Sequence, residues 1–466
     1  MASQPTGIKG SLSVNGAGFP LEVEVISPDS LQVRFTGAET ELQGLGEAPE
    51  SPCLSIQVNG QEIEIGPCRL EPRRAEDGRF GRLTPLDKSF DIEETLVDWL
   101  TDKAQSVFGN LPTLLAYKED IDPAFKDYVS DLIYDLSIYR KLFNDFDKEL
   151  GDAPPRIREL ALKAVIHTEE ERFNRLLDDK LDELARLVAG FDKIQHRHHG
   201  YFFRRQLWDF IIASDLIARG NIKPRGYSGD SKMMNLIYAN DYQGESTFAK
   251  LLFKHSAAHP ASQAVRNRRA LIAKGIKDFR RRANPGPGQK LKVLSVASGA
   301  ATEMWDLFRT PEDCAAFEMC LLDQDKLALA EAKQTADQIM ERLGTEIRIE
   351  YLNYSVRTML MAPGLRNGFG KYDFIYSMGL FDYLTPRVAR ALMSKLCAIL
   401  KDGGELLAGN FHVSNPSRHY MEYWVDWVLY YRTEEEFRKL IDGSPVRDVD
   451  VYFEDTRSQM FLRVKK

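Results

Sequence analysis

Five short runs of mostly apolar residues in the C-terminal half place the strongest constraint on how this chain can fold. Patterns typical of amphipathic helices, ten or more residues long, lie between most of these runs. Strands that are apolar almost throughout must be buried on both faces, which requires helices above and below them. The alternation therefore predicts an α/β architecture with a parallel sheet. The five runs are 292–297, 318–322, 347–352, 374–377 and 405–408.

The first 86 residues have a different pattern, because apolar residues alternate with polar ones. A period of two places each apolar set on one face of a strand. Asn59-Gly60 separates two such runs, and both residues tolerate the positive φ of a type I′ turn. The sequence therefore predicts a hairpin at 54–66 and a small β-barrel or sandwich over residues 1–86.

Residues 90–225 change to apolar spacings of three and four. These spacings predict amphipathic helices that pack against one another, with Asp122-Pro123 as a start signal. Three neighbouring histidines form a candidate metal-ligand set, but a polar helix face is the more common role for such residues. We therefore expect no metal at His196, His198 and His199.

The overall composition narrows the function. The chain has 69 acidic and 62 basic residues, for a net charge of -7. A general nucleic-acid-binding protein needs a basic face, so we expect no nucleic-acid partner. No apolar run approaches the ~20 residues of a membrane span, and the N-terminus lacks a signal-peptide pattern. Five scattered cysteines disfavour a disulfide scaffold, so we expect a cytoplasmic protein.

The ends of the first two predicted strands of the parallel sheet carry the clearest chemical signal. The first ends in a turn of small residues around Gly299, which leads into a helix and allows backbone to approach a ligand closely. The second ends in Asp323, about 24 residues later. A carboxylate at this strand tip is placed to accept both ribose hydroxyls of a nucleoside. Together they predict a nucleoside site.

Residues 290–466 resemble a class I S-adenosylmethionine-dependent methyltransferase. Five segments carry the resemblance, in order: VLSVASGAATE, LLDQD, LNYS, YDFIYSMGLFDYL and LKDGGELLAGNF. The resemblance implies a Rossmann-like fold and S-adenosylmethionine as cofactor. It assigns cofactor binding to Ala297, Gly299, Glu303, Asp323, Gln324, Asn353, Tyr354 and Ser377. The chain departs from the family where Ser295 replaces a common acid and where Ala297 and Ala301 replace usual glycines.

A nicotinamide-dependent dehydrogenase is the competing interpretation. It predicts a fuller GxGxxG turn and a catalytic Tyr-x-x-x-Lys, Cys or His pair, and none of these is evident in the sequence. The last segments, 445–454 and 460–464, instead predict a terminal antiparallel strand pair, as the methyltransferase fold has. We therefore favour the methyltransferase.

Residues 226–268 carry a narrower resemblance. The segments GYSGD, MMNLIYANDYQGES and AVRNR are similar to bacterial 3-hydroxypalmitic acid methyl ester biosynthesis proteins. The resemblance implies a lid at 226–284 before the core at 290–466, so that 226–466 form the methyltransferase domain. We expect four lid residues to meet the methionine part of the cofactor, although a helix–helix salt bridge is an equal alternative. They are Tyr227, Asp230, Arg266 and Arg268.

In the same group of proteins, a helical region and a degenerate PilZ-like barrel precede the core, which we expect here at 90–225 and 1–86. PilZ domains that bind cyclic di-GMP carry an Arg-rich lead and an Asp-x-Ser-x-x-Gly motif. The chain has Arg73-Arg74 but lacks the second motif. We therefore expect no cyclic di-GMP binding.

The segment after the fifth parallel strand, 410–427, is the candidate acceptor site, because such folds bind ligands at the carboxyl ends of strands. Its aromatics at 420, 423, 424 and 427 form a helical stripe, which is either the wall of an apolar pocket or ordinary core. Histidines could orient or deprotonate an acceptor, and an arginine could bind a carboxylate. The catalytic candidates are His412, His419, Arg418 and Tyr383, with Asp382 beside the last.

The sequence thus predicts a multidomain α/β enzyme that methylates a small, hydrophobic acceptor. A carboxylic acid, giving a methyl ester of the 3-hydroxy fatty acid type, is the first choice. A hydroxyl or amine acceptor is the alternative and needs a general base. A catalytically silent sensor that only binds S-adenosylmethionine is the alternative of another class. A homodimer through the helical region is a further expectation.

Overall fold

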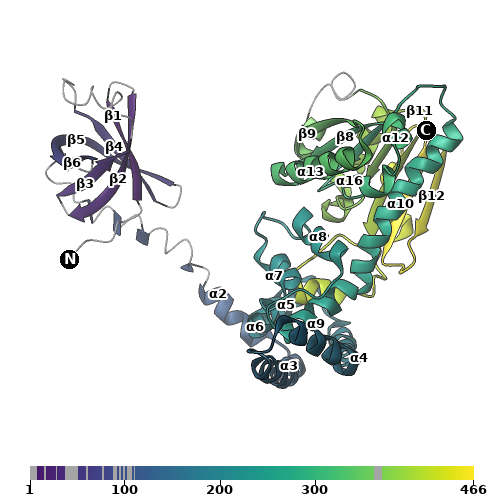
Figure 1. Cartoon of the computed structure of the whole chain (residues 1–466), viewed down its shortest axis with the longest axis horizontal. Coiled ribbons are helices and arrows are strands. Elements are labelled where there is room, and N and C mark those ends of the chain that lie inside the picture. Colours follow the sequence, from purple (N-terminus) through teal and green to yellow (C-terminus); the bar gives the residue numbers. More distant parts are fainter. Residues whose placement is uncertain are drawn as a thin grey trace. The chain divides into compact units, whose positions relative to one another are not determined.

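The computed structural model of the chain forms two compact units, Met1–Ala116 and Tyr117–Lys466 (Figure 1). The residues that it describes are 8–14, 17–27, 29–36, 51–58, 61–75, 78–87, 92–93, 96–97, 100–101, 108–109, 111–361 and 370–466. Within these ranges, no helix combines the length and the apolar character that crossing a membrane requires.

The described part of the N-terminal unit contains a closed barrel of six antiparallel strands, in the order β1-β2-β3-β6-β5-β4. Alternate side chains such as Leu12 fill its interior, as the period of two predicts. The predicted hairpin is confirmed, because Val58 of β4 pairs with Gln61 of β5, while Asn59-Gly60 lie outside the described residues. The elements are β1 (Ile8–Val14), β2 (Ala17–Ser27), β3 (Ser30–Phe35), β4 (Cys53–Val58), β5 (Gln61–Ala75), β6 (Gly78–Pro85) and α2 (Leu111–Ala116).

The second unit begins with a layer of helices. The Asp122 side chain accepts hydrogen bonds from the amides of Ala124 and Phe125, so the predicted start signal is an N-cap. The apolar stripes of α3 and α4 are buried against each other and against α9. The helices are η2 (Tyr117–Asp120), α3 (Pro123–Glu149), α4 (Pro155–Val188), α5 (Lys193–Gln206), α6 (Trp208–Ile211), α7 (Asp215–Ile222), α8 (Ser231–Ala239), α9 (Thr247–Ala258) and α10 (Pro260–Ala283).

The same unit contains a sheet in the order β12-β13-β11-β10-β7-β8-β9. Strands β7 to β11 are parallel, and β13 is antiparallel to both of its neighbours. This is the Rossmann-like sheet of class I methyltransferases, so the predicted fold of the core is confirmed. The strands are β7 (Leu291–Val296), β8 (Phe317–Asp323), β9 (Arg348–Asn353), β10 (Tyr372–Ser377), β11 (Leu400–Phe411), β12 (Asp448–Phe453) and β13 (Gln459–Lys465).

Both faces of the sheet are covered, which explains the nearly continuous apolar runs. In β7, Val293 packs into a core with α10, α11 and α13, whereas Leu294 packs into a core with α14 and α16 on the other face. Figure 1 shows α10 reaching from the helical layer to the sheet. The covering elements are α11 (Met304–Leu307), α12 (Pro311–Ala316), α13 (Lys326–Leu343), α14 (Val356–Met361), η3 (Phe381–Tyr383), α16 (Pro386–Ile399), α17 (Glu434–Arg438) and η5 (Lys439–Ile441). The turn η4 (Tyr420–Trp424) packs into the helical layer instead.

The helical layer shares its hydrophobic core with the chain that follows β11. Tyr423 and Trp424 of the π-helical turn η4 contact Phe203 of α5, with ring centroids 5.9 and 5.4 Å apart. The predicted aromatic stripe at 420–427 is therefore buried core. Because the strand order changes direction at β7, which pairs with both β8 and β10, a crevice for a ligand is expected at the carboxyl ends of these strands.

Candidate active site

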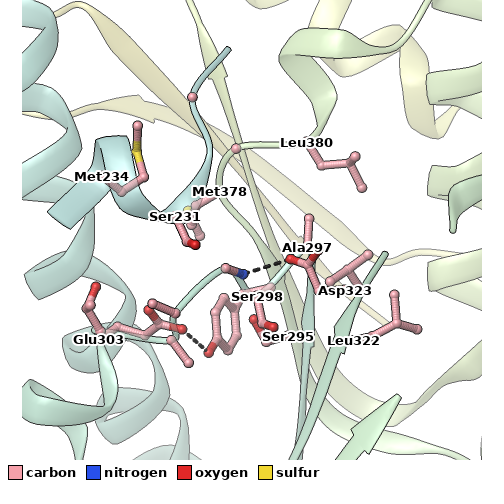
Figure 2. A pocket seen from close by; sticks show the side chains of 18 of the residues that line it. Ser231, Met234, Ser295, Ala297, Ser298, Glu303, Leu322, Asp323, Met378 and Leu380 are labelled. Atoms are coloured by element: carbon pink, nitrogen blue, oxygen red, sulfur yellow. Dashed lines mark hydrogen bonds between the residues drawn. The ribbon is translucent and has the colours of Figure 1, made fainter. Parts of the chain in front are cut away.

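A cavity of about 260 Å³ occupies this crevice, between the strand ends, α8 and α10 (Figure 2). The lining comes mainly from the last residues of β7, β8 and β10, from the loops that follow these strands, and from α8, α10 and the segment before α8. The lining comprises Tyr227, Gly229, Ser231, Met234, Asn235, Tyr238, Arg268, Ile272, Ser295, Val296, Ala297, Ser298, Gly299, Ala300, Ala301, Thr302, Glu303, Leu322, Asp323, Gln324, Tyr354, Val356, Tyr376, Met378, Gly379, Leu380 and Tyr383.

The loop after β7 has an unusual backbone. Ala297, Gly299 and Ala301 have φ values of 56°, 56° and 49°, in the left-handed region that normally favours glycine. Each alanine there costs about 1–2 kcal/mol relative to a right-handed conformation. The loop thus adopts, at two alanines, the backbone conformation that glycine usually adopts.

Asp323 ties this loop to the end of β8. Its carboxylate accepts hydrogen bonds from the amides of Gly299, at 2.8 Å, and Asp325, at 2.9 Å. Figure 2 shows the first of these bonds beside Ala297 and Leu322. The side chain is buried, and burial raises the pKa of its carboxyl. The Gln324 backbone also favours the charged carboxylate, which can accept about four hydrogen bonds in all and so retains acceptor capacity for a ligand hydroxyl.

The other predicted residues near β8 divide into two groups. Gln324 and Tyr354 line the cavity together with Asp323. Asn353 instead donates to the backbone oxygens of Asp323 and Gln324, at 3.0 and 2.9 Å, and so holds the strand end in place. Ser377 also lies outside the lining, because its hydroxyl donates to the Val296 oxygen.

Glu303 brings a second buried carboxylate into the cavity. The Tyr376 hydroxyl donates to it at 2.6 Å, as Figure 2 shows, and burial raises the pKa of the Glu303 carboxyl. Glu303 is also the N-cap residue of α11, without a capping hydrogen bond from its side chain. A carboxyl group therefore lies where the loop enters its helix.

Arg268 brings a buried cation from α10. It is 8% exposed, and its guanidinium donates to the Met378 oxygen at 3.2 Å and to the Met234 sulfur at 3.3 Å. Among the described carboxylates, none forms an ion pair with it. Glu303 and Asp382 interact with it electrostatically, but neither is bonded to it, so its guanidinium keeps donors for an anionic ligand.

The lid residues are used in different ways. Tyr227 lines the cavity with Arg268. Asp230 is the N-cap of α8 and accepts two hydrogen bonds of 2.7 Å from Arg219, so it is a structural residue outside the lining. Arg266 donates to the backbone oxygens of Ile237 and Ala257 and is also outside the lining.

The structure does not bring three of the four catalytic candidates to the cavity. His412 contacts Ser414, with 2.6 Å between Nδ1 and Oγ, and Arg418 pairs with Glu422 at 3.0 Å. His419 packs near His196 in the helical layer, where burial and the neighbouring Arg418 lower its pKa to about 4. His412 directly follows β11 but packs against Phe453 of β12, with ring centroids 5.0 Å apart, whereas the chain then turns into the helical core and takes Arg418 and His419 with it.

Tyr383, the fourth candidate, lines the cavity. Its hydroxyl donates to the Ser228 oxygen at 2.8 Å and accepts from the Trp427 indole at 2.7 Å. Burial raises its pKa, so the phenol is neutral and fully hydrogen-bonded. Tyr383 is thus arranged to position the chain at Ser228 rather than to remove a proton.

Sequence reasoning missed part of the lining. Ser298, Met378 and Leu380 directly follow β7 and β10, and their position at strand ends could have identified them. Met234 and Ile272 come from α8 and α10, whose apolar patterns signal only burial. The three neighbouring histidines point to different partners: His196 contacts the Tyr423 hydroxyl, His198 stacks on Tyr117, and His199 accepts from the Asp122 amide. Among the described residues, no group of three or more His, Cys, Asp or Glu side chains could hold a metal ion.

Comparisons with known proteins add the following. No protein-family profile matches the chain, and no curated protein does. A possible exported protein from Bordetella parapertussis is 15% identical, over 67% of this chain and 99% of its own, with a TM-score of 0.40. Magnesium protoporphyrin IX methyltransferase from Synechocystis PCC 6803 with bound SAH is 14% identical, over 44% of this chain and 87% of its own, with a TM-score of 0.33.

A third similar structure is an S-adenosylmethionine-dependent methyltransferase from Clostridium acetobutylicum. It is 12% identical, over 43% of this chain and 91% of its own, with a TM-score of 0.31. The fold assignment itself rests on the strand order and on the antiparallel β13.

Asp382 generates a test of the electrostatics beside the cavity. It is 2% exposed, its carboxylate accepts from the Phe411 amide at 2.6 Å, and burial raises its pKa to about 6. The Asp382 carboxyl has a pKa of about 3.9 in the unfolded chain. At pH values between ~3.9 and ~6, this carboxyl therefore keeps its proton in the folded protein but has released it in the unfolded chain. Its contribution to stability is therefore present below pH ~4 and is lost as pH rises to about 6.

We predict that Asp382→Asn, which keeps the acceptor oxygen but does not titrate, gains stability relative to the wild type as pH rises from ~4 to ~6. Urea unfolding of both proteins across this range measures the difference. Asp402→Asn, at a carboxylate whose side chain is 86% exposed, is the control. A difference that stays flat with pH, or falls, contradicts the assignment.

Proposed function

We propose that the Tyr117–Lys466 unit is a methyltransferase that uses S-adenosylmethionine. The observation that carries the proposal is the set of three buried charged side chains in one cavity, Asp323, Glu303 and Arg268. S-Adenosylmethionine has a ribose diol, an ammonium, a carboxylate and a cationic sulfur. Two carboxylates and one guanidinium complement the ribose diol, the ammonium and the carboxylate of this cofactor.

Asp323 is proposed to hold the ribose. Its carboxylate is fixed by two backbone amides, and its remaining lone pairs suit two hydroxyl donors. Gln324, Tyr354, Leu322 and Val356 lie in the lining on the same side, where they offer apolar and polar contacts to a base.

Arg268 and Glu303 are proposed to hold the methionine part. Arg268 lacks a carboxylate partner among the described residues and can bind the cofactor's carboxylate, while Glu303 can accept from its ammonium. A dinucleotide fits less well, because its pyrophosphate sits at the N-terminus of the helix after β7. The buried Glu303 carboxylate occupies that helix start and would repel it.

When bound, S-adenosylmethionine supplies a methyl group on a positively charged sulfur. The chain's own residues, from α8, α10 and the strand ends, line the cavity and displace part of the solvent around a bound ligand. They also orient the reactants, which in favourable cases contributes ~7–11 kcal/mol.

For the acceptor, we propose a small hydrophobic carboxylic acid, which gives a methyl ester. A carboxylate is already anionic at neutral pH and needs no general base. No histidine, lysine or cysteine is among the described lining residues, and burial keeps Tyr227, Tyr376 and Tyr383 protonated by raising their pKa values. Met234, Ile272, Met378 and Leu380 give the cavity apolar walls. A 3-hydroxy fatty acid is the specific candidate.

Asp323→Ala is predicted to weaken S-adenosylmethionine binding by about tenfold or more, because a hydrogen bond to a charged group contributes ~1.5–3 kcal/mol. Asp323→Asn, which retains one acceptor oxygen, should lose less. Calorimetric titration measures both, with Asp337→Ala at an exposed site of α13 as the control. Unchanged affinity in a folded Asp323→Ala protein refutes the ribose assignment.

His412→Ala and His419→Ala are predicted to retain most of the methyl-transfer rate, since neither residue lines the cavity. The measurement is incubation with labelled cofactor and a panel of carboxylic acids, phenols and amines, followed by mass spectrometry. Transfer to acids alone supports the ester. A collapse of rate in either folded variant points to hydroxyl or amine chemistry, and binding without any transfer identifies a silent sensor.

A homodimer through the helical region stays a proposal, as does the PilZ-like character of the barrel. The dimer is supported by an apolar stripe on the solvent side of α3, where Tyr134, Ile138 and Leu142 are 67%, 43% and 58% exposed. Their spacing of four places them on one helix face. We predict that Ile138→Glu reduces the mass measured by light scattering, and a monomeric wild type contradicts the dimer.

A further inference from the structure

The segment 223–230, between α7 and α8, crosses the edge of the cavity and is called the strap below. It contains three residues with left-handed backbone, Lys223, Gly226 and Gly229, at φ values of 50°, 84° and 77°. Tyr227 and Gly229 line the cavity. Such a backbone has few stabilising bonds of its own, so its position depends on the side chains that hold it at each end.

One end of the strap is fixed to the helical layer. The Ser228 hydroxyl contacts the backbone oxygens of Gly220 and Asp426, and the Ser228 oxygen accepts from Tyr383. The fit is close at Gly229, where an added Cβ would lie 2.5 Å from the Tyr383 hydroxyl oxygen. This end therefore has little freedom to move.

Lys223, at the start of the strap, pairs with Asp426 at 2.5 Å on the same helical side. Toward the sheet, the middle of the strap is held by Arg225. Its guanidinium donates to Asp325 at 2.9 Å and to Glu331 at 2.5 Å, and also to the Ser231 hydroxyl at 2.7 Å. The side chain is only 12% exposed. Tyr227 adds a weaker bond to the same Asp325 oxygen, at 3.2 Å.

Asp325 connects this attachment to the ligand site. Its amide donates to the Asp323 carboxylate, and its own carboxylate accepts from Arg225, Tyr227 and the Leu327 amide. The residue proposed to bind ribose and the residue that holds the strap thus share one turn at the end of β8.

We propose that Arg225 is a positioning residue that latches the strap over the nucleoside end of the cavity, through Asp325 and Glu331. The latch must open for an adenosine-containing ligand to enter or leave. This inference rests on the proposed function for the identity of the ligand, but the latch itself is a property of the ligand-free chain. Arg225 contacts no reacting group, so its role lies in ligand retention.

Breaking the latch should free the strap without changing the chemistry. Arg225→Gln and Glu331→Gln each remove one side of the same ion pair, so both should raise the dissociation rate and the KM for S-adenosylmethionine about tenfold, with kcat little changed. Arg225→Lys should restore part of the loss. Arg463→Gln, which breaks the 3.1 Å pair with Asp450 on β12, is the matched control.

Two measurements keep the latch separate from the proposed function. Hydrogen–deuterium exchange of peptides covering 223–231 in the ligand-free protein should be faster in both latch variants than in the wild type and the control. Stopped-flow dissociation of S-adenosylmethionine should show the same order. A wild type that binds no S-adenosylmethionine refutes the proposed function, while the exchange data still decide the latch. The latch is overturned if peptides covering 223–231 exchange in Arg225→Gln at the same rate as in the wild type. A fall in kcat at constant KM overturns it as well.

Discussion

The hydrogen bond from the Gly299 amide to the Asp323 carboxylate joins the ends of the two neighbouring strands on which the cavity is built. β7 and β8 are in register, with Val296 opposite Leu322, so the loops that follow them leave the sheet at the same level. The Ser298 amide bonds the Leu322 oxygen beside it. Because these bonds fix the loop backbone, they also fix where Glu303 and the start of α11 lie.

The strands were predictable because their signal is local. A parallel strand buried on both faces is apolar at nearly every position, and Val293 and Leu294 do enter different cores. The barrel strands were predictable from the opposite pattern, since one face is buried and the other is not. The sequence pattern did not reveal that the helical layer shares a core with the chain after β11, where Phe125 contacts Tyr423 across a long sequence separation.

The parts of the site that were predicted also follow from local sequence patterns, whereas the parts that were missed depend on contacts between distant segments. Ala297 and Gly299 lie in the loop after β7 and Asp323 ends β8, so the strand assignment alone places them at the crevice. The path of the chain after Phe411 depends on distant partners. Arg432 bonds the Asn410 side chain and the Phe381 oxygen, and the His412 amide bonds the Ser458 oxygen. These contacts direct His412 and His419 away from the cavity, and no local pattern encodes them.

Two energetically unfavourable features meet in this cavity: alanines with left-handed backbone and a buried arginine without an ion pair. Different interactions offset the cost of each. The methyl group of Ala301 is buried in the core beneath the loop, so packing compensates part of its backbone strain. Ala297 lines the cavity, and Arg268 is buried without a carboxylate partner in the described chain. Natural sequences depart from local rules mainly at functional sites. An anionic group beside Arg268 would relieve its desolvation, whereas a cationic group there would add to it. The proposed ligand therefore presents opposite charges to Arg268 and to Glu303 at once, as an amino acid does.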